Sequence, residues 1–359
     1  MSETQATVSG SKVVFLCEDR SFDFRDLIDA AHFRGELDPV WKDLSRLIVA
    51  ERKADTEELE VDDEAIESAA EQFRYERDLI TAEETERWLA ERGLTLNDFG
   101  AHFVRHHWDK HWTDVEVRPL DYVSAPNDLR DLLLCEVILS GEVDQMARRL
   151  SRRVAARCAA RPQSAGPALI AEERTRFLER HGMAESQLDD WLERLGRDAD
   201  WLREMLAMEA IHRRACTALL TQREREREIR ALRLPLTRFE VEAVEFDSLN
   251  SAREALLCVR EDGMALEEIA SEGRYPYRKP QLLLEEIPDD LQQKFLSVQP
   301  GEILEPIPRG DGFHLYRVIG KEGPNPDDPI VRKRVESVIL DRHFADLTAR
   351  YIHWRILPA

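Results

Sequence analysis

The spacing of hydrophobic positions along the chain changes near residue 235. In the stretch 24–37, and repeatedly until about residue 233, apolar residues recur three or four positions apart, the spacing of one buried face of a helix. Pro235 then interrupts this pattern, since proline lacks the backbone donor that a helix needs. Residues 239–246 alternate between apolar and polar side chains, which predicts a strand. A short apolar run at 13–17 predicts one more strand, before the helices.

The last third of the chain mixes helices with strands. The pattern predicts helices at 251–263, 265–273 and 289–299, a proline-containing loop at 275–281, and strands at 303–307 and 313–320. This order, β-α-α-α-β-β, is that of a small α+β domain over residues 236–323. A helix with a short strand, 329–356, closes the chain. The fold class predicted for the whole is α+β and multidomain, mostly α, with the C-terminal helix packing back on the helical part.

Helix boundaries are marked in one place with particular clarity. Thr81 and Glu84 have the spacing of a capping box, in which each side chain bonds the backbone of the other residue. Gly93 follows the same helix at the position where glycine commonly ends one. The sequence therefore predicts a helix between Thr81 and Gly93.

The helical part contains an internal repeat. Residues 24–37 resemble 129–143, and each stretch has a glycine, Gly35 or Gly141, that is followed nine positions later by Leu-Ser-Arg. Residues 86–99 likewise resemble 189–202. Landmarks in the same order predict two copies of one helical module. The predicted domains are a first helical copy at 1–118, a second at 119–235, the small α+β domain at 236–323 and a returning segment at 324–359.

Charge excludes some partners. The net charge is −21, which argues against binding to nucleic acid or anionic membranes, both of which are polyanions. Residues 1–118 carry 29 acidic and 15 basic side chains, whereas residues 119–235 carry 20 of each, and all 20 basic residues are arginine. The arginine-rich stretch 148–161 fits either an acidic peptide or the acidic first module.

Cysteine usage and the first residues suggest a compartment. The chain has five cysteines and no CxxC pair, and such an odd, dispersed set predicts reduced thiols and no disulfide framework. The polar start, 1–12, lacks the apolar stretch of a signal peptide, and no apolar run reaches the length of a membrane span. We therefore expect a cytoplasmic protein.

Three stretches resemble one family of proteins. QPGEILEPIPRGDGFHLYRVIGK, residues 299–321, resembles the C-terminal half of a parvulin-type peptidyl-prolyl isomerase domain, and residues 236–323 follow the element order of that domain. Residues 47–106 resemble the N-terminal chaperone module of SurA and PpiC-like foldases. Residues 328–356 resemble the helix and strand that rejoin that module. The resemblance covers most of the chain, with the second helical copy as an addition.

The resemblance implies a peptide-binding foldase or chaperone with an altered isomerase site. His314 matches the second family histidine, whereas Ala243 is the nearest match to the first. The peptide-binding positions that the resemblance implies are Ile287, Leu291, Leu296, Phe313 and Arg309. Since one histidine is missing, we predict a parvulin fold with little or no isomerase activity, in which His314 is structural.

One helix has metal-binding spacing. In AHFVRHHWDKHW the histidines form two i, i+4 pairs, a spacing with which two imidazoles can share a zinc ion; they are His102, His106, His107 and His111. Asp109 or Asp114 would have to complete such a site, and no HExxH glutamate is present. In the alternative interpretation, Phe103, Val104 and Trp108 pack while the histidines face solvent. We favour the solvated histidines and predict no cofactor.

The main functional hypothesis is a non-catalytic, peptide-binding chaperone or maturation factor. Its partner would be a peptide or unfolded protein client in the cytoplasm, such as a ribosomally made precursor peptide, and a peptide-modifying enzyme is a further candidate. One alternative is an active isomerase with a rearranged site that recruits Tyr275, Tyr277 or His314. Another is a scaffold subunit that holds a modifying enzyme.

Overall fold

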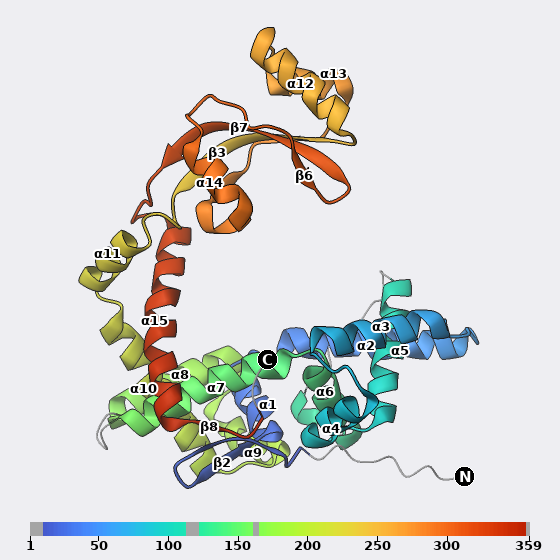
Figure 1. Cartoon of the computed structure of the whole chain (residues 1–359). Helices are drawn as coiled ribbons and strands as arrows, with labels where there is room; N and C mark the ends of the chain where they lie inside the picture. Colours follow the sequence, from blue (N-terminus) through green and yellow to red (C-terminus); the bar gives the residue numbers. More distant parts are fainter. Residues whose placement is uncertain (1–9, 113–121, 161–164, 357–359) are drawn as a thin grey trace. The chain divides into compact units, whose positions relative to one another are not determined.

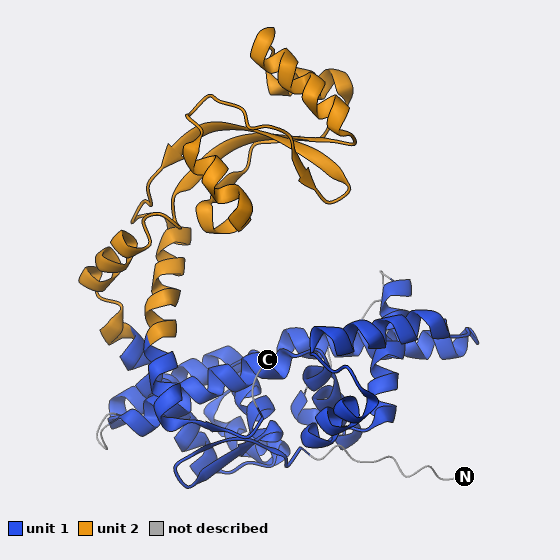
Figure 2. Ribbon diagram, in the orientation of Figure 1, with its two compact units in different colours: residues 1–216, 343–359 blue, residues 217–342 orange. Residues whose placement is uncertain are grey.

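A computed structural model describes residues 10–112, 122–160 and 165–356, and the chain forms two compact units (Figure 2). Unit 1 comprises residues 1–216 and 343–359, and unit 2 comprises residues 217–342. The chain is mostly α-helical with two small antiparallel sheets, so the predicted fold class is confirmed. Within the described residues, no helix is both long and apolar enough to cross a membrane.

Ten helices begin within the described residues of unit 1, and Figure 1 labels each of them. They are α1 (Phe24–Phe33), α2 (Asp38–Thr56), α3 (Asp63–Glu76), α4 (Ala82–Arg92), α5 (Leu96–His111), α6 (Asn127–Leu139), α7 (Glu142–Ala159), α8 (Pro167–His181), α9 (Leu188–Leu195) and α10 (Ala199–Leu219). Short 3-10 turns lie at η1 (Tyr122–Ser124) and η2 (Glu185–Gln187). The capping box of Thr81 and Glu84 is confirmed at the start of α4, and Gly93 ends that helix with a φ of 74°, where glycine is favoured.

The two predicted helical copies share one hydrophobic core. The first predicted copy contains helices α1 to α5, and the second contains α6 to α10. Gly35 and Gly141 each follow the first helix of their copy, and both have positive φ. Helix α1 packs against α7 and α2 packs against α6, so each copy contacts the other through its first two helices. Phe33 of the first copy stacks on Phe177 of the second, with ring centroids 4.8 Å apart. The duplication stays a prediction. The structure shows that the two predicted copies share a core.

The two ends of unit 1 meet in a small sheet. Its strands are β1 (Val13–Cys17), β2 (Arg20–Asp23) and β8 (His353–Trp354), in the order β2-β1-β8. The β1–β8 pairing places Phe15 opposite Trp354, and their ring centroids are 5.3 Å apart. The C-terminal strand therefore pairs with the first strand of the helical unit. The short strand β2 was not expected from the sequence.

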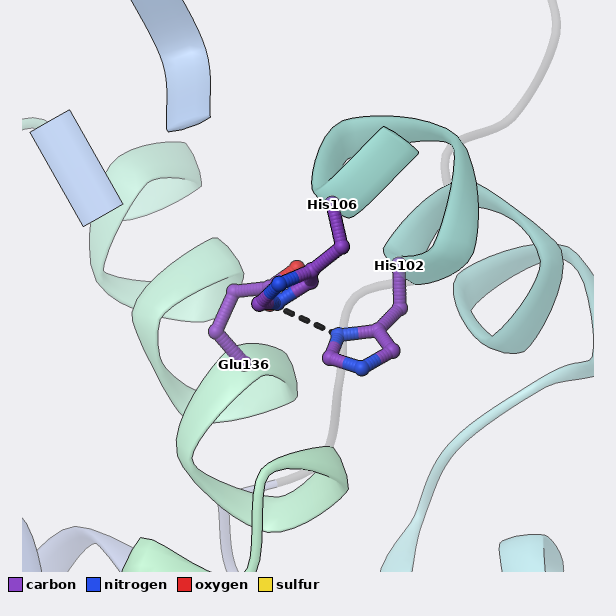
Figure 3. A group of neighbouring side chains, drawn as sticks. All are labelled: His102, His106 and Glu136. Atoms are coloured by element: carbon purple, nitrogen blue, oxygen red, sulfur yellow. Dashed lines mark hydrogen bonds and ion pairs between the residues drawn. The ribbon is translucent and has the colours of Figure 1, made fainter. Parts of the chain in front are cut away.

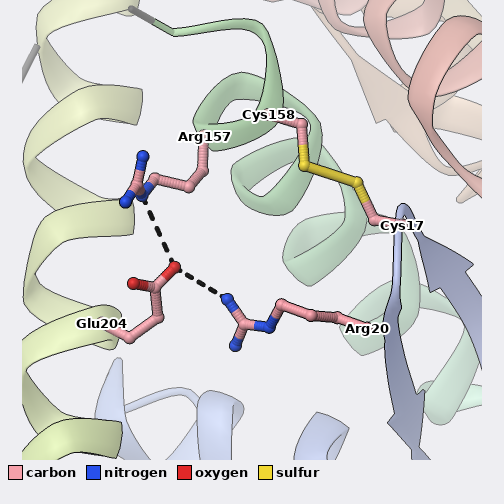
Figure 4. Close-up of a disulfide and its surroundings, with 5 residues drawn as sticks. All are labelled: Cys17, Arg20, Arg157, Cys158 and Glu204. Atoms are coloured by element: carbon pink, nitrogen blue, oxygen red, sulfur yellow. Dashed lines mark hydrogen bonds and ion pairs between the residues drawn. A yellow bond between two sulfur atoms is a disulfide. The ribbon is translucent and has the colours of Figure 1, made fainter. Parts of the chain in front are cut away.

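A disulfide links Cys17 of β1 to Cys158 of α7 (Figure 4). The expectation of reduced thiols throughout is therefore wrong for this pair. The two cysteines are 141 residues apart, and only the packing of α7 against β1 brings them together. The spacing of the cysteines in the sequence does not predict this contact. Cys135, Cys216 and Cys258 are free.

Unit 2 contains a five-stranded antiparallel sheet. Its strands are β3 (Arg238–Phe246), β4 (Tyr277–Arg278), β5 (Gln281–Leu283), β6 (Ile307–Arg309) and β7 (Gly312–Glu322), in the order β4-β3-β7-β6 with β5 also paired to β3. Its helices are α11 (Gln222–Ala231), α12 (Leu249–Glu261), α13 (Leu266–Gly273), η3 (Leu284–Glu286), α14 (Asp289–Ser297) and α15 (Pro329–Tyr351), the last continuing into unit 1.

Two local expectations for unit 2 are corrected. The predicted loop 275–281 contributes β4 and β5, because its backbone pairs with β3 on both sides of Lys279. The predicted strand 303–307 is reduced to a single bridge at Ile303, and β6 begins only at Ile307. Pro306 lies between the two, and proline has no N–H to donate to a sheet.

The sheet of unit 2 is covered on both faces. On one face α14 packs through Leu291 and Phe295 against Phe239 of β3. On the other face α12 and α13 pack against β3 and β7 around a second apolar cluster that includes Val244 and Leu315. Successive residues of a strand point to opposite faces, so this arrangement fixes which side chains of β3 and β7 share a face.

Candidate functional site

A small pocket of about 160 Å³ lies on the sheet of unit 2. It is lined by residues of β3, β7, β6 and the β4–β5 segment, which are Ala243, Val244, Glu245, Pro276, Arg278, Pro280, Leu282, Arg309, His314 and Tyr316. The volume is below the 300–1,000 Å³ of typical small-molecule sites, so the pocket suits a single small side chain.

The pairing of β3 with β7 sets the position of each polar group in the pocket. Glu245 lies directly opposite His314, and Ala243 lies directly opposite Tyr316. Because side chains that face each other across a strand pair share a face, these four residues lie on the side of the sheet that α14 covers. Tyr316 is 4% exposed and lines the pocket together with Leu282.

The Tyr316 hydroxyl connects two other lining residues. Arg309 Nη1 donates to the Tyr316 oxygen over 2.9 Å, and His314 Nδ1 lies 3.3 Å from the same oxygen. A hydroxyl that accepts from a guanidinium can still donate its own proton, so it donates to His314 Nδ1 when that nitrogen is unprotonated. The His314 and Tyr316 rings lie nearly parallel, at 24°, with centroids 5.8 Å apart.

The charge of His314 is controlled by its surroundings. Burial lowers the pKa of the imidazole below its ordinary value; Glu245 raises that pKa, and Arg309 and Arg278 lower it further. The imidazole is therefore neutral at physiological pH, which agrees with its acceptance of the Tyr316 proton. A neutral ring in this place is an uncharged wall of the pocket.

The sequence resemblance to parvulin-type isomerases implies a site with two histidines, and the pocket contains one of them, His314. Ala243, the residue nearest the first position, offers a methyl group that makes no hydrogen bond to a client carbonyl. Rotation about a peptide bond must cross about 18–20 kcal/mol, and a catalyst has to stabilise the twisted amide. The lining residues combine apolar side chains with two exposed arginines, Arg278 and Arg309.

The structure places the sequence-predicted peptide-binding residues in different surroundings. Arg309 lines the pocket together with His314. Ile287 and Leu291 are 4% and 7% exposed within the apolar cluster beneath the sheet, so they support the pocket from below. Leu296 is 39% exposed on α14 and is not among the lining residues, and Phe313 packs in the cluster of the opposite face.

Most apolar lining residues, and Tyr316, were not expected from the sequence. Pro276 and Pro280 come from the segment 275–281 that the sequence assigned to a loop, and Leu282 follows it directly. The two prolines in that segment were visible, but its return along β3 was not. The tyrosines considered for a rearranged catalytic site lie elsewhere: Tyr275 packs on Phe246 with centroids 4.6 Å apart, and the Tyr277 hydroxyl donates to Glu242 over 2.7 Å.

The histidine-rich helix α5 places two of its four histidines in one cluster (Figure 3). His102 and His106 face Glu136 of α6, and His102 is 6% exposed, so the expectation that all four histidines face solvent is wrong for it. His107 and His111 are not part of this cluster. Asp109 is bound by Arg46 over 2.6 Å, and Asp114 lies outside the described residues.

The arginines of α7 pair with acidic side chains of the same unit. Arg149 Nη1 lies 3.3 Å from Glu36 Oε2, and Arg153 Nε donates to Glu209 over 2.5 Å. Arg157 lies 3.5 Å from Glu204, which also pairs with Arg20 beside the disulfide (Figure 4). These contacts join α7 to both copies of the helical module.

Comparison with known proteins gives structural neighbours alone. No family model and no curated protein sequence matches the chain. Among solved structures, the peptidylprolyl isomerase PrsA of Bacillus cereus matches with 13% identity and a TM-score of 0.37, covering 59% of this chain and 83% of its own. The foldase PrsA of Streptococcus pneumoniae matches with 11% identity and a TM-score of 0.26, covering 66% of this chain and 91% of its own.

A structure from Campylobacter jejuni, described as one of two SurA-like chaperones, matches with 10% identity and a TM-score of 0.18, covering 62% of this chain and 87% of its own. The structural neighbours are thus PrsA and SurA-like foldases, the kind of protein that the sequence resembles.

Proposed function

We propose that the chain is a non-catalytic chaperone or maturation factor that binds an extended segment of a client peptide or unfolded protein. The observation that carries the proposal is the pocket beside His314, whose lining includes apolar residues such as Leu282 and whose size fits one proline or other small side chain. The sequence resemblance to parvulin-containing foldases supports the same kind of role. The client we propose is a ribosomally made precursor peptide.

Binding without catalysis follows from the lining residues. A client proline placed against Leu282 and Tyr316 loses its contact with water, which is favourable by about 25 cal/mol for each Å² of apolar surface. Arg309 and Arg278, both exposed at the pocket, offer donors to client backbone carbonyls. These contacts stabilise the planar and the twisted amide alike, and uniform binding of that kind gives no acceleration.

Two other functions make different demands on the same residues. An active isomerase requires His314 to act on the bound X-Pro bond, in which case its replacement abolishes acceleration. A scaffold for a peptide-modifying enzyme requires no client in the pocket at all. Both are therefore decided by measuring client binding and isomerisation together.

The test uses fluorescently labelled X-Pro peptides, with Pro→Ala peptides for comparison. Binding is followed by anisotropy, and isomerisation is followed by NMR exchange in the same samples. Ala243→Leu adds three carbons to the pocket wall, and Ala265→Leu makes the same change at an exposed position outside the pocket. We expect Ala243→Leu to weaken binding at least about tenfold, corresponding to about 1.4 kcal/mol, with Ala265→Leu unchanged and no acceleration by any variant.

Equal binding by the wild type and Ala243→Leu would contradict the proposal. Acceleration that is lost in His314→Ala would establish the isomerase instead. No binding of any proline peptide would favour the scaffold.

A further inference from the structure

The strongest feature outside the pocket is the cluster of His102, His106 and Glu136 in unit 1 (Figure 3). The two imidazoles come from successive turns of α5, and the carboxylate comes from α6, which packs against it. His102 Nδ1 lies 2.7 Å and His106 Nε2 lies 3.2 Å from the same carboxylate oxygen, Oε2 of Glu136. One ligand atom from each residue lies within 4.8 Å of the other two.

We propose that His102, His106 and Glu136 form a binding site for a divalent transition-metal ion of the zinc type. Two imidazole nitrogens and one carboxylate oxygen are a donor set that Zn²⁺ takes in proteins, and three protein ligands leave a fourth position for water or a further ligand. With bonds of about 2.0–2.2 Å, the ligand atoms of a tetrahedral site are about 3.3–3.5 Å apart. The 3.2 Å separation from His106 is close to this spacing, whereas the 2.7 Å separation from His102 is that of a hydrogen bond and lengthens by about 0.6 Å when a metal binds.

The second carboxylate oxygen is held by a neighbouring arginine. Arg105 donates to Glu136 Oε1 through Nε over 2.8 Å and through Nη2 over 2.6 Å. This pair fixes the carboxylate so that Oε2 faces the imidazoles, and such hydrogen bonds to ligand carboxylates are usual around metal ions. The guanidinium itself contacts Oε1 and leaves Oε2 to the metal.

Metal binding requires the two imidazoles to change the ring nitrogen that carries the proton. In the structure each imidazole nitrogen that faces Glu136 lies within hydrogen-bond distance of Oε2, and an ionised carboxylate can only accept. A metal ion takes the place of these protons. An imidazole that carries its proton on the ring nitrogen away from Glu136 offers a lone pair toward the metal.

The cluster is buried on one side and accessible on the other. Glu136 and His102 are 5% and 6% exposed, whereas the side chain of His106 is 40% exposed. A cation can therefore enter past His106 and exchange its fourth ligand with solvent. The first module, with 29 acidic and 15 basic side chains over residues 1–118, favours the approach of a cation.

The test is titration of the untagged, chelator-treated chain with Co²⁺, followed by visible absorption, and with Zn²⁺, followed by calorimetry. We expect one ion per chain and cobalt bands of a four-coordinate site without a thiolate band. His106→Ala removes the most exposed ligand, and we expect it to weaken binding at least about tenfold. His107→Ala and His111→Ala are matched controls on the same helix, and we expect them to bind as the wild type does.

Several results would overturn the proposal: no binding at micromolar Zn²⁺, binding that survives in His106→Ala, or binding that is lost in His107→Ala. Circular dichroism of each variant separates a lost ligand from a lost fold. Glu136→Gln is avoided as the first variant because it also removes the partner of the buried Arg105.

Discussion

His212 of α10 gives unit 1 a defined response to acid. Its ring stacks on Phe344, with centroids 4.7 Å apart at 22°, and Cys216 Sγ lies 3.8 Å from its Nδ1. Burial, and after it the positive charges of four arginines, lower the pKa of His212 to about 3; the arginines are Arg153, Arg152, Arg34 and Arg213. Arg153 pairs with Glu209, Arg34 with Glu36 and Arg213 with Glu173.

The sign and size of the effect follow from the two pKa values. The folded-state pKa, about 3, is below the unfolded value of about 6.5, so the folded state disfavours the proton. The stability from this histidine is present above about pH 6.5 and is lost as the pH falls toward about 3. One pKa unit corresponds to about 1.4 kcal/mol, so at about pH 5 the folded state has lost about 2 kcal/mol relative to about pH 7.

The assay is urea unfolding followed by tryptophan fluorescence at the two pH values. All seven tryptophans belong to unit 1, so the signal reports this unit alone. His212→Phe keeps a ring against Phe344 and cannot titrate, so we expect its free energy of unfolding to fall about 2 kcal/mol less than that of the wild type. His353→Gln, at an exposed histidine of the same unit, is the control and keeps the wild-type difference. Equal losses in the wild type and His212→Phe would refute the reasoning.

Three further substitutions test the packing of each unit. Phe295 is 1% exposed and lies between Phe239 and Tyr316, so Phe295→Ala should destabilise the sheet of unit 2 by about 3–5 kcal/mol. We expect faster hydrogen exchange in β3 and β7 and unchanged unfolding as followed by tryptophan fluorescence, and unchanged exchange would contradict this. Asp29 is 1% exposed, and the Arg197 guanidinium donates to its carboxylate over 2.7 Å. Arg197→Met removes this donor and should lower the free energy of unfolding of unit 1 by about 3–5 kcal/mol in urea. A decrease below about 1 kcal/mol would show that Asp29 is neutral in the fold. Gly35→Ala places a Cβ 2.8 Å from the Arg180 side chain at a φ of +69° and should lower unit 1 stability by about 1–2 kcal/mol, whereas a gain would mean that α1 ends differently.

Local signals in the sequence predicted much of the fold. The capping box at Thr81 and the glycine at Gly93 specify where α4 begins and ends, because both act through backbone groups within one turn. The alternation of 239–246 predicted β3, whose two faces are both covered by helices. Proline near residue 235 marked the change from helices to the sheet.

The contacts that make the candidate sites depend on residues far apart in the chain. The pocket requires the segment around Pro276 and Pro280 to pair with β3, and no local pattern distinguishes that segment from a loop. Glu136 is 34 residues from His102, and its partner role depends on the packing of α6 against α5. The metal-binding spacing in α5 was visible in the sequence, but the carboxylate that completes the cluster was not.

The most direct test of the account is NMR of the ¹⁵N-labelled chain titrated with an X-Pro peptide. If the pocket holds the client, the amide shifts that move first belong to Ala243, His314, Tyr316 and the non-proline residues between 277 and 282, and the same peptide concentration moves them much less in Ala243→Leu. Shifts confined to unit 1, or equal shifts in Ala243→Leu, would contradict binding at this pocket.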